Sequence, residues 1–179
     1  MAQTIHYRPL AHGECARIRE IDASQYIGKA WRSVDGVLRL VEINYLDPDF
    51  PEGYENHLCR LRQTISEQGI AIGAFEEDGS LAGFAALNLA PFGKSYRHVL
   101  LDQLFISKKL RRKGIGKHLF FLAASEARKH HMQKIYICAG SSEETLAFYR
   151  ALGCVDAAEI DADLLANDPR DIQLEYALL

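Results

Sequence analysis

The feature that most constrains this chain is a short basic segment that joins an apolar run to an amphipathic one. Six of the ten residues in Lys108–Lys117 are Lys or Arg, and Gly114 and Gly116 lie among the other four. The preceding run, Val99–Ile106, has the apolar and β-branched composition of a buried strand. The following stretch, Ile115–His131, repeats apolar residues at helical spacing. The basic segment is therefore expected to lead from a buried strand into the N-terminus of a helix.

Such a junction predicts an anion-binding site. The first backbone N–H groups of a helix lack partners, and the helix dipole places positive charge there. Gly114 and Gly116 have no Cβ, so their backbone can approach a pyrophosphate closely, while Arg111, Arg112 and Lys113 add positive charge. The alternative interpretation is that the glycines only shape a turn and the basic residues form a solvated loop.

Two other phosphate-binding motifs do not fit this segment. A dinucleotide fingerprint needs a third Gly where Leu119 stands, and a Walker A loop needs Ser or Thr where His118 stands. The chain has a net charge of −3, and removing the six positive charges of Lys108–Lys117 leaves −9 on the rest. This segregation favours a small anionic ligand over a nucleic-acid groove, which needs a wide basic face.

The remaining sequence predicts one α/β domain across residues 1–179. Asp35-Gly36 lies between β-branched and aromatic runs and predicts a hairpin over Tyr26–Tyr45. Further strands are predicted at Thr4–Arg8, Ile70–Phe75, Leu81–Leu89, Val99–Ile106, Ile135–Ala139 and Ile172–Ala177, and helices at His12–Asp22, Tyr54–Gly69, Ile115–His131 and Glu143–Leu152. Ile70–Phe75 and Leu81–Leu89 are apolar on both faces, so we expect them in the interior of a mixed sheet.

The composition, 48% hydrophobic and 25% charged, is typical of a globular protein. The cysteines Cys15, Cys59, Cys138 and Cys154 have no C-x-x-C spacing, so we expect neither a disulfide framework nor a metal site. The first residues lack a basic region followed by an apolar core, and no later run is long enough to span a membrane. We therefore expect a cytoplasmic protein without a membrane partner.

Two motifs resemble those of one enzyme family, the GNAT N-acetyltransferases. The family's coenzyme A motif, R/Q-x-x-G-x-G/A after a strand, is matched by Arg111, Gly114 and Gly116. Arg112 is a departure, because members often carry Gly there. The segment Ser142–Cys154 is similar to a second family pattern, N-x-x-A-x-x-F-Y-x-x-x-G-F.

In that second segment Phe148, Tyr149 and Gly153 match the family pattern, whereas Ser142, Thr145 and Cys154 do not. The resemblance is specific over about Val99–Val155, roughly a third of the chain. It implies a mostly antiparallel sheet of about seven strands flanked by about four helices. It also implies acetyl-CoA as co-substrate and direct acetyl transfer to a primary amine in a ternary complex.

The resemblance also implies where acetyl-CoA binds. The pantetheine arm would lie between the strands that end at Ile106 and Ala139. The residues expected to bind the co-substrate are Leu104, Phe105, Ile106, Arg111, Arg112, Lys113, Gly114, Ile115, Gly116, Lys117 and Ser142.

Two residues are expected to act in catalysis. Tyr149 falls on the family's general-acid position, and a phenol is a suitable donor to a departing thiolate. Its alternative role is core packing with Leu146 and Leu152. Asp102 stands where many members carry Glu and is a candidate base, direct or through water, or else a structural hydrogen-bond partner. Glu175 is a weaker candidate for the base.

The acceptor is expected to be a small-molecule or peptide amine. Acidic residues are frequent in Glu42–Glu55 and Asp156–Glu175, and an acidic groove there would favour a cationic amine. A solvated surface is the simpler explanation of these residues. Two rival functions are an acyl-CoA sensor without turnover and a nucleic-acid-binding module. The sensor is disfavoured by Tyr149, and the module by the lack of interleaved aromatics in the basic run. Monomer and homodimer are both compatible with the sequence.

Overall fold

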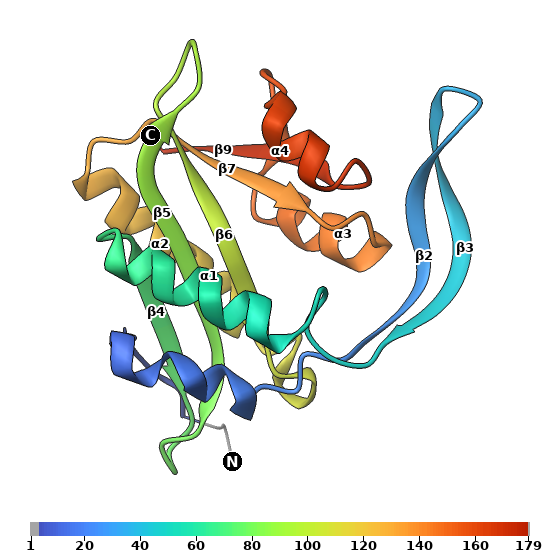
Figure 1. Ribbon diagram of the computed structural model, residues 1–179. Helices are drawn as coiled ribbons and strands as arrows, with labels where there is room; N and C mark the ends of the chain where they lie inside the picture. The colour runs from blue at the N-terminus through green and yellow to red at the C-terminus, as the bar shows by residue number, and fades with distance from the viewer. Residues whose placement is uncertain (1–3, 179) are drawn as a thin grey trace.

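A seven-stranded sheet forms the centre of the molecule (Figure 1), and the computed structural model describes residues 4–178. The strand order is β1-β4-β5-β6-β7-β9-β8, and only β6 and β7 are parallel neighbours. The strands are β1 His6–Pro9, β4 Ile70–Phe75, β5 Leu81–Phe92, β6 His98–Ile106, β7 Lys134–Ala139, β8 Val155–Asp156 and β9 Ile172–Ala177. The predicted mixed, mostly antiparallel sheet is confirmed, and β4 and β5 are interior strands as their apolar faces predicted.

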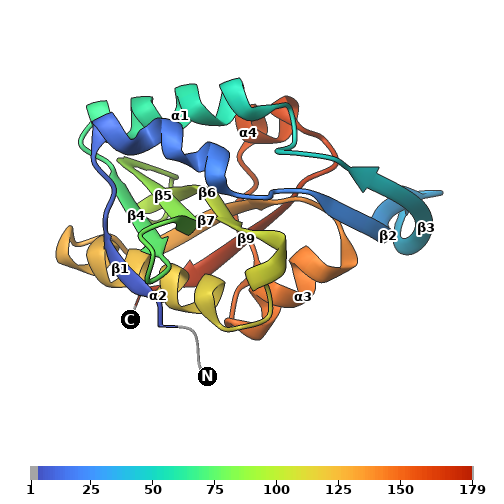
Figure 2. The same cartoon turned by 90° about the horizontal axis from the view of Figure 1, so that it is seen from below.

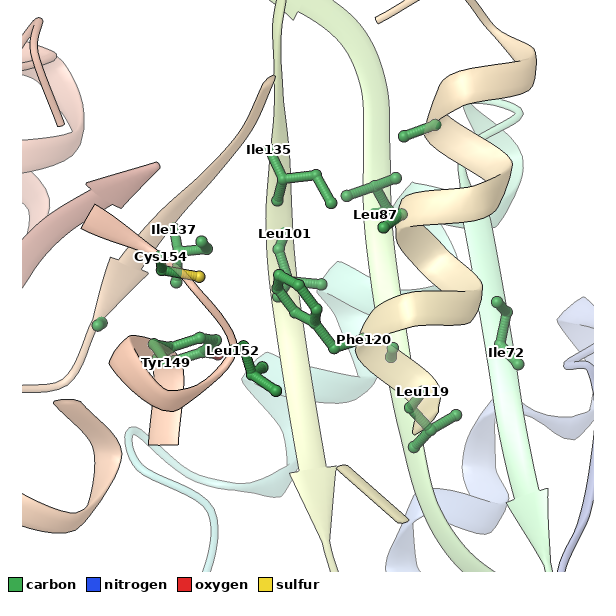
Figure 3. Close-up of a cluster of buried hydrophobic side chains, with 14 of the residues drawn as sticks. Ile72, Leu87, Leu101, Leu119, Phe120, Ile135, Ile137, Tyr149, Leu152 and Cys154 are labelled. Carbon is green, nitrogen blue, oxygen red and sulfur yellow. The ribbon is translucent and has the colours of Figure 1, made fainter. Parts of the chain in front are cut away.

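Helices cover both faces of this sheet (Figure 2). The 3₁₀ helix η1 (His12–Glu20) and α1 (Tyr54–Ser66) lie over one face, and α2 (Ile115–Lys129) and α3 (Glu143–Ala151) lie over the other. The side chains of α2 and α3 close the larger of two apolar cores (Figure 3). None of the helices between residues 4 and 178 combines the length and apolarity needed to cross a bilayer.

The predicted hairpin forms an arm that projects from the body of the molecule (Figure 1). It consists of β2 (Gln25–Val34) and β3 (Val37–Asp47), which form a separate two-stranded sheet, and an isolated antiparallel bridge joins Ala30 of β2 to Ser142. Asp35 and Gly36 have φ of 52° and 74°, and positive values at both positions are what a two-residue type I′ turn requires. A backbone hydrogen bond of 2.8 Å, from the N–H of Trp31 to the carbonyl of Ser141, connects the arm to the body.

Two short segments differ from the sequence prediction. His12–Glu20 is a 3₁₀ helix rather than an α-helix, and its buried Cys15 and Ile18 lie three residues apart, which is one 3₁₀ turn. The helix α4 (Ala162–Asn167) and the two-residue strand β8 were not predicted. α4 buries none of its side chains, so it has no apolar stripe by which the sequence could reveal it.

Glu175 links the first residues of β6 and β7. Its carboxylate forms an ion pair of 2.6 Å with Lys134 and lies 3.4 Å from the Nε2 atom of His98. These partners are the first residues of β7 and β6, and all three side chains are largely buried. Glu175 does not line the large cleft described below. Its position therefore indicates a structural ion pair in place of the catalytic base considered from the sequence.

We expect Glu175→Gln to lower the free energy of unfolding by about 3–5 kcal/mol at neutral pH, because it leaves Lys134 buried without its counter-charge. Burial alone would raise the pKa of the Glu175 carboxyl group. Hydrogen bonds, the one from Lys134 first among them, outweigh burial and leave this pKa below its usual value. A lowered pKa stabilises the fold above the unfolded pKa and loses that effect as the pH falls through the folded one. The difference between wild type and variant in urea unfolding should therefore shrink in acid.

The control is Glu126→Gln. The Glu126–Lys129 ion pair has the same length, 2.6 Å, but its side chains are 37% and 64% exposed. An exposed pair contributes about 0–1 kcal/mol, so this variant should unfold almost like wild type. Equal losses in the two variants would contradict the role given to Glu175.

Candidate active site

The parallel strands β6 and β7 separate shortly after they begin. They pair only where His98–Leu100 faces Lys134–Tyr136. Beyond this point β6 stays with β5 and β7 stays with β9, so the two strands diverge (Figure 1). The pairing of β5 with β6 skips Asp102, which makes Asp102 the extra residue of a β-bulge. Because a bulge bends its strand, the bulge at Asp102 turns β6 away from β7 just after their pairing ends at Leu100.

A cleft of about 1180 Å³ opens between the separated strands. The arm, α1 and the segment before β9 complete its walls. Of the residues predicted to bind acetyl-CoA or to act in catalysis, those that line the cleft are Asp102, Leu104, Phe105, Ile106, Arg111, Ser142 and Tyr149. Arg112 to Lys117 follow directly after Arg111 and form the entry into α2.

The N-terminus of α2 has the geometry of an anion site. The first helical hydrogen bond runs from the N–H of His118 to the carbonyl of Gly114 at 3.0 Å, so the N–H groups of Ile115, Gly116 and Lys117 have no partner within the helix. No side chain caps this end. Gly114 has φ of 84°, in the left-handed region, and a Cβ there would meet only open space. These free amides fit a phosphate group.

Arg111 is held by the backbone on two sides. Its Nε donates to the carbonyl of Ile106 at 3.0 Å, and its Nη2 donates to the carbonyl of Ala23 at 3.1 Å. Burial lowers the pKa of this half-buried guanidinium. Arg111 therefore ties the basic loop to the end of β6 and to the segment before β2. Its nitrogen donors are partly used in positioning the loop.

Tyr149 lies at the inner end of the cleft on α3. Ser142 begins this helix by accepting a hydrogen bond of 3.1 Å from the N–H of Thr145. The Tyr149 ring lies near Leu152 and Cys154 in the core (Figure 3), yet the residue also lines the cleft. Burial, reinforced by Cys154 and Asp171, raises the pKa of the Tyr149 hydroxyl. That hydroxyl makes no hydrogen bond with any residue between 4 and 178, so it is free to donate to a group bound in the cleft.

Asp102 is occupied by an ion pair with α1. The Nη2 atom of Arg60 donates to Asp102 Oδ1 at 2.7 Å and to the Asp102 carbonyl at 3.1 Å. Gln103 donates to Asp102 Oδ2 at 3.4 Å, and its amide oxygen lies 2.9 Å from Nδ1 of the buried His57. A polar chain thus connects α1 with the bulge of β6 and holds the bulge in place.

Comparison with known proteins agrees with this geometry. The family profile described as "Acetyltransferase (GNAT) family" matches residues 38–154, more than half of the chain. The chain belongs to the GNAT acetyltransferase family. It is therefore an acyltransferase. A search of curated protein sequences gave no significant match.

Solved structures share the GNAT fold along the whole chain. Nourseothricin acetyltransferase has a TM-score of 0.72 and 20% identity, over 98% of this chain and 99% of that one. A candidate streptothricin acetyltransferase of Bacillus anthracis, solved with acetyl-CoA, has a TM-score of 0.71 and 18% identity, over 96% of both chains. The PaiA N-acetyltransferase of Thermoplasma acidophilum, solved with coenzyme A, has a TM-score of 0.62 and 18% identity, over 97% and 99%.

The cleft of this GNAT chain also contains a residue that the sequence did not single out. Asp171, directly before β9, lines the cleft together with Tyr149. Burial raises the pKa of its carboxyl group to about 6. The only signal in the sequence was the acidic character of the segment Asp156–Glu175, which does not distinguish one carboxylate from its neighbours.

We expect Gly114→Asp to weaken acetyl-CoA binding about 10- to 100-fold relative to Gly114→Asn, measured by calorimetry. The two side chains have nearly the same size, and both tolerate the left-handed conformation better than other residues do. Each variant should lose about 1–2 kcal/mol of stability from its positive φ. They differ in a negative charge beside the phosphate site, which is worth about 1–4 kcal/mol at contact distance. Equal affinities would rule out pyrophosphate binding at Gly114.

Proposed function

We propose that this chain is an N-acetyltransferase that moves the acetyl group of acetyl-CoA directly to a primary amine while both substrates are bound. The observation that carries this proposal is a single cleft, lined by Ile106 and Arg111 beside the α2 N-terminus and by Tyr149 at its inner end. A thioester held along this cleft has phosphate-binding amides at one end and a proton donor at the other. Release of free thiol from acetyl-CoA, measured against a panel of amines and peptides, tests this activity.

The co-substrate would bind mainly through backbone groups. Pairing of β6 with β7 ends at Leu100, so the edge of Leu104–Ile106 that faces β7 is open. Its N–H and C=O groups can pair with the amides of the pantetheine arm as a further strand would. The N–H groups of Arg112–Lys117 would bind the pyrophosphate, with the exposed side chains of Arg112 and Lys117 adding positive charge. Ser142 would line the opposite wall.

Carboxylates in the cleft favour a cationic acceptor. Five of them line it: Asp47, Glu52, Asp102, Asp168 and Asp171. The arginines of the cleft are engaged within the protein, as in the Arg60–Asp102 and Arg170–Asp168 ion pairs. Two similar structures are acetyltransferases named for nourseothricin and streptothricin. Among small-molecule and peptide amines, we therefore favour a small acceptor that carries positive charge.

Tyr149 would protonate the departing thiolate. Burial raises the pKa of its hydroxyl, and the same dry surroundings raise the pKa of a thiol bound beside it. Donor and acceptor thus remain comparable in basicity, which general acid catalysis requires. An acyl-CoA sensor would share the binding groups but would release no thiol with any amine.

We expect Tyr149→Phe to reduce kcat about 10²- to 10⁴-fold, because it removes the general acid and keeps the ring. Affinity for acetyl-CoA and the melting temperature should stay near wild type, since the hydroxyl has no hydrogen-bond partner within residues 4–178. The measurements are kcat and kcat/KM with an accepted amine, together with coenzyme A titration and thermal unfolding. A kcat within about threefold of wild type would remove Tyr149 from the mechanism.

Tyr136→Phe is the matched control. The Tyr136 hydroxyl lies outside the cleft, donates to the carbonyl of Glu159 at 3.0 Å and accepts from the N–H of Asp161 at 3.0 Å. Each lost hydrogen bond contributes about 0.5–1.5 kcal/mol to stability, so this variant should have a lower melting temperature than wild type. Its kcat should remain near that of wild type. Tyr149 and Tyr136 are thus expected to show opposite effects on rate and stability.

A further inference from the structure

One carboxylate in the cleft has no side-chain or backbone partner. Asp102 is bound by Arg60 at 2.7 Å, and Asp168 lies 3.3 Å from Arg170. Of the remaining acids, Asp47 accepts a hydrogen bond from the backbone N–H of Asp49, and Glu52 accepts a hydrogen bond of 2.7 Å from the side-chain amide of Asn56. Among residues 4–178, by contrast, no group hydrogen-bonds to the carboxylate of Asp171 or forms an ion pair with it.

The fold places Asp171 where β7 has already separated from β6. Ile172 pairs with Ala139, the last residue of β7, so Asp171 lies beside the end of that strand. Its N–H donates to the carbonyl of Asp168 at 3.1 Å, which fixes the turn. After burial, the charge of Asp171 is the next cause that raises the pKa of Cys138, and it also raises that of Tyr149. All three side chains line the cleft.

We propose that the carboxylate of Asp171 accepts the proton of the attacking amine. This inference rests on the acetyl transfer proposed above and assigns the base of that reaction. A base must line the space in which the substrates react and be free of competing donors, and among the acids of the cleft Asp171 meets both conditions within residues 4–178.

The electrostatic surroundings suit this role. Burial, together with Asp168, raises the pKa of Asp171 to about 6. A base is most effective when its pKa lies near the working pH, because it is then ionised and still takes up a proton. The groups that face it are Asp168 and Arg170 on its own segment, Glu52 before α1, Arg60 on α1, Cys138 on β7 and Tyr149 on α3. The charges of Arg170 and Arg60 act to lower the pKa of Asp171, but neither guanidinium forms an ion pair with its carboxylate.

The protons balance with two groups. The bound ammonium gives one proton to Asp171, which later releases it to solvent. The lone pair of the neutral amine forms the N–C bond, and the C–S bond breaks with its electrons on sulfur. Tyr149 protonates that thiolate, and the proton that leaves the new amide nitrogen returns to the Tyr149 oxygen. One proton is released for each acetyl group transferred.

Asp102 is less suited to accept this proton. Arg60 and Gln103 each bind one of its carboxylate oxygens. Proton uptake there would break the ion pair and leave Arg60 without its counter-charge, which is costly in a partly buried site. Asp102 is therefore a positioning residue that shapes the β6 bulge.

The test is the pH dependence of kcat/KM for wild type and Asp171→Asn with one accepted amine. Wild type should lose activity below about pH 6, where Asp171 becomes protonated. The Asn variant should be slower by about 10²- to 10⁴-fold at neutral pH. Its kcat/KM should rise with pH along the ionisation of the amine itself, up to about 10 for a lysine-like amine. Asp171→Glu should restore part of the rate and an acidic limb.

Asp163→Asn is the control, because Asp163 lies exposed on α4 outside the cleft. It should keep the rate and the pH profile of wild type. Coenzyme A titration and thermal unfolding of each variant show whether it is folded. If wild type acetylates an amine and the kcat/KM of Asp171→Asn still falls below about pH 6 as in wild type, Asp171 is not the base. This holds whether or not the variant is slower. If wild type releases no thiol with any amine, the proposed acetyl transfer itself fails.

Discussion

The structure depends on where the hydrogen bonds between β6 and β7 stop. Two parallel strands in one sheet normally pair along their length, which would leave no room between them. Here pairing covers three residues and ends at Leu100, just before the bulge at Asp102. Glu175, Lys134 and His98 hold the paired end with buried polar contacts. The paired end joins the two halves of the sheet, and the open end provides the cleft.

Positive and negative groups lie in different parts of this cleft because different elements supply them. At the β6 end, the chain turns through a left-handed Gly114 into α2, and free amides add to the charge of the basic loop. At the β9 end, carboxylates such as Glu52 and Asp171 face the same space. The anionic co-substrate and the cationic acceptor proposed above would therefore bind at different places. This arrangement agrees with a ternary complex.

Contacts within the protein distinguish similar side chains in this site. Asp102 and Asp171 are both aspartates of one cleft, but Arg60 binds the first, and none of the residues from 4 to 178 binds the carboxylate of the second. Arg111 and Arg112 are adjacent in sequence, yet Arg111 is tied to two carbonyls while Arg112 is exposed. The contacts of each side chain therefore decide which groups remain available for substrates.

The sequence alone determined the features that depend on near neighbours in the chain. Asp35-Gly36 specified a tight turn, the apolar runs of β4 and β5 specified interior strands, and the basic segment Lys108–Lys117 indicated the entry into a helix. Only the tertiary structure decided that Glu175 is a buried ion-pair partner and that Asp171 is an unpaired acid in the cleft. The reason is physical, because local conformation follows from adjacent residues. A carboxylate's proton affinity depends instead on burial and on charges such as Arg60, which come from distant parts of the chain.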